Sequence, residues 1–298
     1  MKSVSIIIPM YNSEQYLNKL FEALEQCAFY ENDEVIIIDN GSTDNSREIC
    51  EIYARRNIGL YKILEYTDKA DSYASRNYGV KNAKGDMLVF TDSDCRPTRE
   101  WLNVARNCIN EGEVMAGDIQ LEVLNNGVWE LYDSVAHLSH CEDNAKKNCV
   151  PTANMAVNHK DFKKVGNFEE RFSGGDFEWS QRAYSKGMKI VFHKEALIYH
   201  PSRKTFEEIK KREERVAYGM GKSAKTAGKS YIPLILSYIL RIFKIDRQIN
   251  YSKKMRSKGA KFKDLIIFNI GFLIIRFKYV LFVSRGYKGK SPRKYGIK

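Results

Sequence analysis

Three short apolar runs, at residues 4–9, 34–39 and 86–91, constrain the fold of this chain more than any other feature. Each run is apolar along most of its length rather than alternating between apolar and polar positions, and the first is rich in β-branched residues. Such runs are typical of strands that are covered on both faces of a sheet. Because helix-length segments separate the runs, the sequence predicts an α/β fold with a mostly parallel sheet.

The segment after the first run has the spacing of an amphipathic helix. Ser13 stands where an N-cap is expected, and the apolar residues that follow recur every three or four positions. They are Tyr16, Leu17, Leu20, Phe21 and Leu24. A second helix is expected to open at residues 43–46, after the second run. These helices would cover the sheet.

Polar residues follow each of the three runs, at 9–12, 39–42 and 92–94. The carboxyl ends of parallel strands meet at one edge of a sheet, and open α/β sheets bind ligands beyond that edge. In the third loop, the carboxylates of Asp92 and Asp94 can hold a hard divalent cation against a diphosphate. The alternative is a pair of solvent-facing turn aspartates. We therefore expect a ligand site at this edge.

Several groups of residues occur in an order that marks a known family. They lie at 4–12, 34–46, 74–79, 83–94, 152–156, 165–169, 175–179 with Arg182, and 199–201. On these residues the chain resembles a family 2 glycosyltransferase of the GT-A fold, in which helices flank a Rossmann-like, mostly parallel sheet. The resemblance extends over about residues 3–220 and implies a nucleotide-sugar donor. The C-terminal quarter lies outside it.

The resemblance also implies which residues contact the nucleotide-sugar. They are Pro9, Tyr11, Asn12, Asp39, Arg76, Asp92 and Ser93. Asp39 is expected to read the edge of the base, usually uracil, because a carboxylate accepts hydrogen bonds from a base N–H. Taken alone, Asp39 also fits a turn aspartate, and Arg76 also fits a surface salt bridge.

A metal site and a catalytic base complete the implied machinery. The resemblance implies that Asp94 ligates Mn²⁺ or Mg²⁺ and that His200 completes the metal site. A lone histidine fits a structural role equally well. Asp176 matches the base that takes the proton of the acceptor hydroxyl in inverting transfer, and its alternative role is that of a helix N-cap.

The residues around Asp176 depart from the family pattern in one respect. Many relatives have Glu-Asp where this chain has Gly175-Asp176. The missing glutamate puts the neighbouring acceptor contacts in doubt, but not the base. Glu178 is the second candidate for the base. Trp179 fits either stacking on an acceptor sugar or, by preference, packing in the core.

Charge divides the chain unevenly. The net charge of +12 comes from −8 over residues 1–200 and +20 over residues 201–298. We expect a GT-A domain at 1–220 and a basic amphipathic helical tail at 221–298. A tail of this charge is typical of a protein with an anionic partner.

The tail holds two strongly apolar segments, at 232–245 and 265–283. Polar residues interrupt the second one, namely Asn269, Gly271, Arg276 and Lys278. We therefore expect residues 231–298 to lie on an anionic membrane surface rather than to cross the bilayer. The alternative is a helical subdomain with a solvated basic face. Nucleic acid is not expected as a partner, because the apolar segments favour lipid.

The remaining expectations concern location and reaction. The six cysteines lack the spacing of a zinc site, and residues 1–4 lead directly into a strand-like segment rather than a secretory signal. We expect a cytoplasmic enzyme, peripheral on the inner face of the cell membrane. It would be an inverting, metal-dependent transferase from a UDP-sugar to a lipid-linked saccharide or cell-surface polysaccharide.

Two other functions fit parts of the sequence. The first is a non-catalytic, glycosyltransferase-like scaffold that binds lipid or nucleic acid through the tail. The second is a sugar-nucleotide pyrophosphorylase, which ranks last because its first loop is Gly-rich and loop 9–12 is not.

Overall fold

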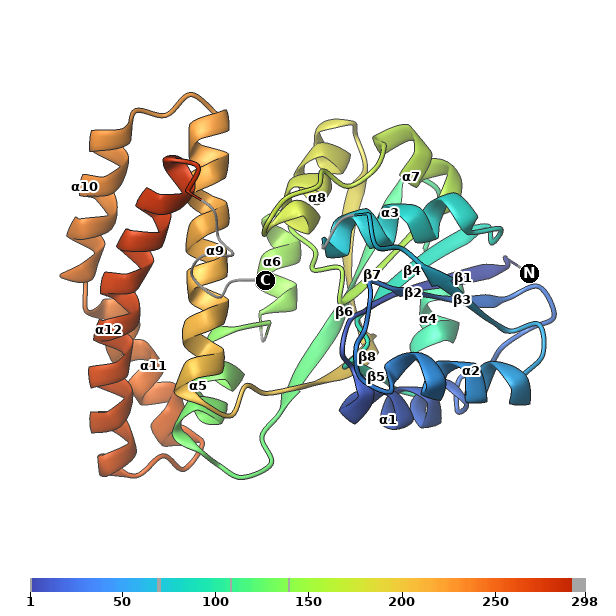
Figure 1. Ribbon diagram of the computed structural model, residues 1–298, viewed down its shortest axis with the longest axis horizontal. Coiled ribbons are helices and arrows are strands. Elements are labelled where there is room, and N and C mark those ends of the chain that lie inside the picture. The colour runs from blue at the N-terminus through green and yellow to red at the C-terminus, as the bar shows by residue number, and fades with distance from the viewer. Residues whose placement is uncertain (1, 69–70, 108, 139, 291–298) are drawn as a thin grey trace. The chain divides into compact units, whose positions relative to one another are not determined.

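A computed structural model describes residues 2–68, 71–107, 109–138 and 140–290 (Figure 1). The strands are β1 (Val4–Met10), β2 (Glu34–Asp39), β3 (Tyr61–Glu65), β4 (Met87–Thr91), β5 (Arg96–Pro97), β6 (Glu113–Glu122), β7 (Asn154–Asn158) and β8 (Lys189–Pro201). The helices are α1 (Glu14–Leu24), α2 (Ser46–Arg56), α3 (Ser72–Asn82), α4 (Trp101–Asn107), α5 (Val128–Ala136), α6 (Cys141–Lys146), α7 (His159–Val165), α8 (Gly175–Ser185), α9 (Phe206–Thr226), α10 (Tyr231–Ile242), α11 (Asp246–Ser257) and α12 (Phe262–Tyr287).

The chain forms two compact units. The first comprises residues 1–120, 138–170 and 175–201. The second comprises residues 121–137, 171–174 and 202–298.

The first unit is built on a sheet of eight strands in the order β3-β2-β1-β4-β7-β6-β8-β5. Strands β3, β2, β1 and β4 run parallel to one another. Strand β7 runs antiparallel to both β4 and β6, and β5 runs antiparallel to β8. The three strands predicted from the apolar runs therefore lie in the parallel half, as expected, and the whole sheet is mixed.

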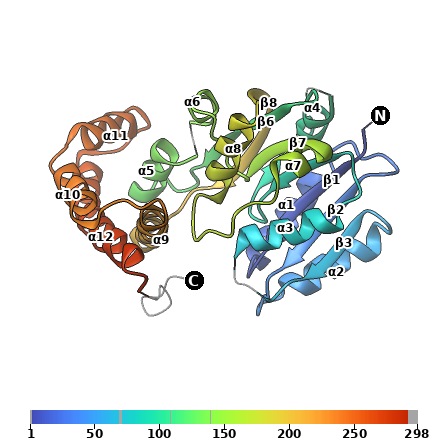
Figure 2. The ribbon, with the colours of Figure 1, turned by 90° about the horizontal axis from the view of Figure 1, so that it is seen from above.

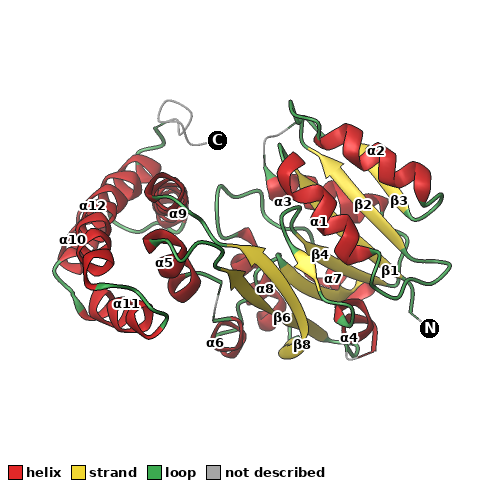
Figure 3. Ribbon diagram, turned by 90° about the horizontal axis from the view of Figure 1, so that it is seen from below, coloured by secondary structure: helices red, strands yellow, loops and turns green. Residues whose placement is uncertain are grey.

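Both faces of the parallel half are buried, which explains its unbroken apolar runs. Successive side chains of a strand point to opposite faces of the sheet. Val35 and Ile37 pack in the core that α1, α2 and α4 cover, whereas Ile36 and Ile38 pack in the core beneath α3, α7 and α8. Figures 2 and 3 show these helices on the two sides of the sheet.

The second unit is helical and contains α5 and α9–α12. Within it α12 packs between α9 and α10 (Figure 1). Helices α9 and α12 approach closely at glycines: a Cβ atom on Gly221 would lie 2.0 Å from the carbonyl oxygen of Val283. The boundary expected at 220/221 falls inside α9, and this packing places all of α9 with the C-terminal helices.

Helix α12 is, within the described residues, the one helix long and apolar enough to cross a membrane. One third of its most apolar window, 33%, is buried inside the protein. A core helix of a soluble protein passes the same test of length and composition.

The described cysteines are free thiols. They are Cys27, Cys50, Cys95, Cys141 and Cys149, and Cys108 lies outside the described residues. Burial raises the pKa of the Cys27, Cys50 and Cys141 thiols to about 12, so these groups stay protonated and unreactive at neutral pH.

A buried ion pair joins the N-terminal ends of β1 and β2 to α4. Arg106 Nη2 lies 2.6 Å from Asp33 Oδ2, and each side chain is only 1% exposed. A second bond of 2.9 Å joins Arg106 Nη1 to Asp33 Oδ1, and the backbone N–H groups of Val4 and Tyr30 also donate to Asp33. The Asp33 carboxylate is therefore fully satisfied only while Arg106 is present.

We expect Arg106→Leu to destabilise the first unit strongly, because it leaves the charge of Asp33 buried without its partner. The free energy of unfolding should fall by about 3–5 kcal/mol in urea denaturation. The matched control is Arg47→Ala, which breaks exposed ion pairs with Glu51 and Glu65 and should cost about 1 kcal/mol or less. Equal losses in the two variants would contradict this account.

Candidate active site

The loops that follow β1 and β2 are bonded to each other. Asn12 has a left-handed φ of 47°, a conformation that asparagine tolerates. Its backbone N–H donates to Ser42 Oγ at 3.0 Å, and its side-chain oxygen accepts from the Thr43 N–H at 2.8 Å. The predicted loop with Pro9, Tyr11 and Asn12 is thereby joined to the loop after Asp39, and the Tyr11 side chain is 43% exposed.

Asp39 ends β2 beside Met10 of β1 and is buried. Its Oδ1 accepts from the N–H of Ser42 at 3.0 Å, which is the turn contact that the sequence also allowed. Its Oδ2 accepts no hydrogen bond from the described part of the chain. One oxygen of Asp39 therefore stabilises the turn, while the other remains able to accept a hydrogen bond from a ligand.

Ser13 connects the first loop to the Asp92-Ser93-Asp94 segment. It occupies the N-cap position of α1, as predicted, but its hydroxyl makes no capping bond to that helix. Instead the hydroxyls of Ser13 and Ser93 lie 2.7 Å apart in a hydrogen bond. The loops after β1, β2 and β4 therefore form one bonded group at the carboxyl edge of the parallel strands.

Arg76, in the first half of α3, holds the first aspartate of this segment. It is buried, and its Nη2 donates to Asp92 Oδ1. The salt bridge that the sequence allowed for Arg76 is therefore present, but it is buried rather than on the surface. Its Nε is buried and has no hydrogen-bond partner among the described residues.

Asp92, Asp94, Cys95 and His200 bring their potential ligand atoms within 4.8 Å of one another. The two aspartate side chains are about one-third exposed, at 32% and 30%, so an ion can reach them. Burial and the nearby Asp94 and Asp92 carboxylates raise the pKa of the Cys95 thiol well above its usual value, so Cys95 is a neutral thiol. Two carboxylates and an imidazole suit Mn²⁺ or Mg²⁺.

The orientation of His200 fits a metal ligand. Its Nδ1 lies 2.8 Å from the carbonyl oxygen of Pro201, which can only accept, so Nδ1 carries a proton. Its Nε2 faces Asp94 Oδ2 at 3.5 Å. A nitrogen lone pair facing a carboxylate is stabilised only by a cation between them, either a proton or a metal ion.

Asp176 is the second residue of α8, not its N-cap. The hydroxyl of Tyr73 donates to Asp176 Oδ1 at 2.9 Å, and the backbone N–H groups of Phe177 and Thr152 donate to the same carboxylate. Burial raises the pKa of Asp176, and the Tyr73 hydroxyl and the charge of Arg76 partly oppose that rise. A carboxylate with a raised pKa is a stronger base.

Comparison with known proteins assigns the family. Residues 5–190, more than half of the chain, match the family model described as glycosyl transferase family 2. The glycosyltransferase AglE of Haloferax volcanii is 32% identical over 221 residues, which cover 72% of this chain and 72% of AglE.

The chain belongs to glycosyltransferase family 2. It is therefore a sugar transferase.

Solved structures confirm the GT-A architecture predicted for it. The mannosyltransferase PcManGT from Pyrobaculum calidifontis, in complex with GDP-Man and Mn²⁺, is 14% identical with a TM-score of 0.61, covering 97% of this chain and 88% of its own. Staphylococcus aureus TarS 1-349 in complex with UDP-GlcNAc is 19% identical with a TM-score of 0.54, covering 99% and 92%. TarS, a poly(ribitol-phosphate) beta-N-acetylglucosaminyltransferase, is also 34% identical over 112 residues, which are 37% of this chain and 19% of TarS.

The structure of this glycosyltransferase separates the candidates near Asp176. Trp179 is fully buried, stacks on Phe162 with ring centroids 5.1 Å apart, and donates from Nε1 to Gly166 O at 2.7 Å. The core-packing alternative is confirmed for Trp179. Glu178 is bonded to Arg182 at 2.8 Å, so it serves an ion pair within α8.

Tyr73 was not predicted from the sequence as a site residue. It stands three positions before Arg76, and residues three apart share one face of a helix. If residues 72–82 form a helix and Arg76 lies in the site, Tyr73 is expected to face the site as well. This pattern in the sequence could have identified Tyr73. What the sequence did not contain is the partner, because Asp176 lies 103 positions further along the chain.

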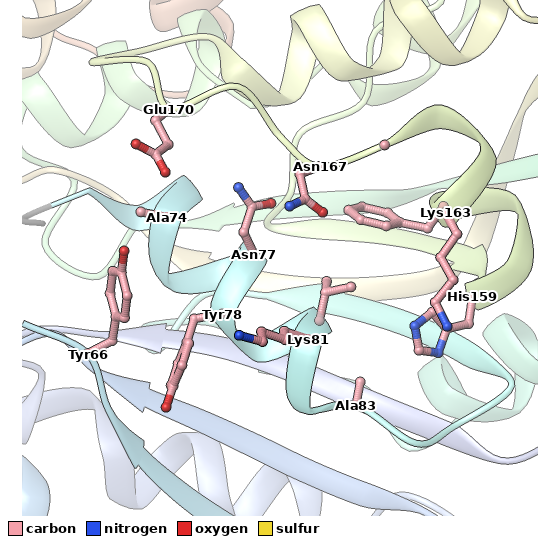
Figure 4. A pocket seen from close by; sticks show the side chains of 13 residues that line it. Tyr66, Ala74, Asn77, Tyr78, Lys81, Ala83, His159, Lys163, Asn167 and Glu170 are labelled. Carbon is pink, nitrogen blue, oxygen red and sulfur yellow. The ribbon is translucent and has the colours of Figure 1, made fainter. Parts of the chain in front are cut away.

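A cavity of about 540 Å³ lies beside the site helix (Figure 4). It is lined by another side of α3, including Asn77, Tyr78 and Lys81, and by residues of 159–170, including His159 and Lys163. None of the site residues predicted from the sequence lines it. This cavity is therefore distinct from the bonded loops at the carboxyl edge.

We expect Tyr73→Phe to move the acid limb of the pH profile of kcat/KM to higher pH. The substitution removes the hydrogen bond that favours the ionised form of Asp176, so the pKa of Asp176 rises further and the base is protonated over a wider pH range. The matched control is Tyr78→Phe on the same helix, which keeps the stack of Tyr78 on Tyr66. A profile unchanged by Tyr73→Phe would contradict the role of this hydroxyl.

Proposed function

We propose that this glycosyltransferase moves a sugar from a nucleoside-diphosphate sugar to an acceptor hydroxyl with inversion at the anomeric carbon. The observation that carries the proposal is that two side chains in the first turns of α3 each bond to one of the site carboxylates. Tyr73 holds Asp176, and three positions later Arg76 holds Asp92. A base candidate and a candidate donor contact are thereby fixed by one helix.

Asp176 is the base in this proposal. Its carboxylate takes the proton of the acceptor hydroxyl as that oxygen bonds to the anomeric carbon. The bond from this carbon to the diphosphate oxygen breaks on the opposite face, and the electron pair leaves with the nucleoside diphosphate. Because attack and departure occur on opposite faces, one base and one step produce inversion.

Asp92, Asp94 and His200 are the residues that would hold a divalent cation, Mn²⁺ or Mg²⁺. When bound, such an ion supplies positive charge to the departing diphosphate. The donor set and the facing lone pairs of His200 and Asp94 support this assignment, as does the Mn²⁺ in the PcManGT structure. Arg76 is a positioning residue here, because its guanidinium orients the Asp92 carboxylate.

Asp39 is proposed to bind the base through its free Oδ2. Both uracil and guanine carry a ring N–H that a carboxylate accepts. TarS was crystallised with UDP-GlcNAc and PcManGT with GDP-Man, so the fold accommodates either nucleotide. Of these two nucleotides we propose UDP, so that the donor is a UDP-sugar. The loop with Pro9, Tyr11, Asn12 and Ser93 would line the nucleotide pocket.

The proposed acceptor is a hydroxyl of a lipid-linked saccharide or a cell-surface polysaccharide. The name of TarS, a poly(ribitol-phosphate) transferase, supports an acceptor of the second kind. The free thiols of the described cysteines suit a reducing compartment, which supports a reaction on the cytoplasmic side of the membrane.

We expect Asp176→Asn to keep the affinity for the donor and to lower the transfer rate by roughly 10²–10⁴-fold, because the amide cannot accept the proton. Donor affinity is measured by calorimetry and transfer by release of the nucleoside diphosphate. The matched control is Glu178→Gln two positions along α8, which should retain most of the transfer rate. If Asp176→Asn retains the transfer rate, a residue other than Asp176 is the catalytic base.

Calorimetry with UDP-GlcNAc, UDP-glucose and GDP-mannose tests the donor and metal proposals together. We expect one UDP-sugar to bind in the presence of Mn²⁺ and Asp94→Ala to lose the effect of Mn²⁺ on that binding. Asp143→Asn, an exposed acid on α6, is the control and should behave as the unmodified protein. Tighter binding of GDP-mannose than of either UDP-sugar would show that Asp39 binds guanine rather than uracil. If no donor binds, the non-catalytic scaffold function is favoured instead.

A further inference from the structure

Helix α12 presents two apolar faces. One face packs inside the second unit, through Phe268, Phe272, Ile275, Phe282 and Val283. The other face is open to solvent and repeats every three or four positions, at Ile266, Ile270, Leu273, Ile274, Phe277 and Leu281. An amphipathic surface helix would carry polar residues on this second face.

Helix α10, which packs against α12, shows the same pattern. Its inward residues include Tyr238 and Ile242, and its exposed residues are Ile232, Leu236, Ile239, Leu240 and, directly after the helix, Phe243. Phe243 is 74% exposed and Ile270 of α12 is 61% exposed. Exposed apolar side chains on two helices that pack together mark an interaction site, because soluble monomers rarely expose large apolar patches.

Two charged side chains in the apolar part of α12, Arg276 and Lys278, bond to neighbouring helices. Arg276 Nη2 donates to the carbonyl oxygens of Arg241 and Lys244 at the C-terminal end of α10. Lys278 Nζ lies 3.2 Å from Glu214 Oε1 on α9. Two of the residues that interrupt the apolar segment in the sequence therefore do not interrupt the exposed face.

Exposed cations lie at the ends of this apolar surface. Lys244 and Arg247 follow α10, Lys261 and Lys263 begin α12, and Lys288 and Lys290 follow it. The only acids from residue 231 onward are Asp246 and Asp264. Two copies of this surface would bring like charges together, whereas anionic lipid headgroups complement them.

We propose that the exposed faces of α10 and α12 form a docking surface that lies in the interfacial layer of an anionic bilayer. The apolar side chains enter the acyl boundary, and the flanking lysines and arginines contact headgroup phosphates. The helices lie in the membrane plane rather than crossing it, because the inward face of α12 is packed against α9. Helix α9 is densely charged, with eight charged residues within Glu207–Arg215, and cannot enter the bilayer core.

This docking surface does not depend on the proposed donor or base, so binding is measured without nucleotide. The full chain is mixed with phosphatidylcholine vesicles, with or without phosphatidylglycerol, and floated on a density gradient. We expect flotation with the anionic vesicles that weakens in high salt, and release of the bound protein by alkaline carbonate. Retention after carbonate would show a spanning helix and overturn the in-plane arrangement.

The apolar arm combines Phe243→Ser, Ile270→Ser and Phe277→Ser, at side chains that are exposed, so the fold is retained and is checked by circular dichroism. We expect roughly a tenfold or larger fall in vesicle partitioning. The matched control is Ile58→Ser, an isoleucine in the first unit that is 93% exposed and should leave partitioning unchanged.

The charge arm combines Lys244→Gln, Arg247→Gln and Lys263→Gln. It should weaken binding to the anionic vesicles and reduce the salt dependence. Unchanged partitioning in the apolar variant, or no flotation of the unmodified protein, would overturn the proposal. A dimer in the absence of lipid that the apolar variant dissociates would instead assign this surface to a second copy of the chain.

Discussion

The contacts made by α3 hold the site together. The Tyr73 hydroxyl bonds Asp176, whose carboxylate would take the acceptor proton, and the Arg76 guanidinium bonds Asp92, which begins the acidic loop after β4. Helix α3 is itself fixed against the parallel strands: a Cβ on Gly79 would lie 2.7 Å from Ile7 of β1. The close approach of helix and sheet therefore sets where the base and the acidic loop lie relative to each other.

Electrostatics in the site follow from this arrangement. Arg76 offsets part of the negative charge of Asp92 and lowers the pKa of Asp176, although burial keeps that pKa above its usual value. Among the described residues Asp94 is paired with no lysine or arginine, and its Oδ2 faces His200 Nε2 at 3.5 Å. A divalent cation held between them would be attracted by the carboxylate and bound by the imidazole nitrogen, so this geometry favours metal binding.

The division of charge along the sequence has a structural counterpart. The acidic two-thirds contains the carboxylates of the proposed donor site, while the cations of residues 201–298 gather on the helical unit. In that unit Arg276 and Lys278 bond to neighbouring helices, and this leaves the outward faces of α10 and α12 apolar. The position of a polar residue within an apolar segment therefore does not reveal whether its side chain faces solvent or the rest of the protein.

The amino-acid sequence was enough to predict three of the four parallel strands (β1, β2 and β4, but not β3), the order of the loops at their carboxyl edge and the family, because buried strands and chemically demanding loops leave local patterns. It did not predict the antiparallel half of the sheet, since β6 and β7 are recognised only by their pairing with β4 and β8. The partners of Asp176, the burial of Arg76 and the inward charges of α12 were decided by the tertiary structure. Each of these joins residues far apart in the chain, and such contacts leave no periodic signal in a single sequence.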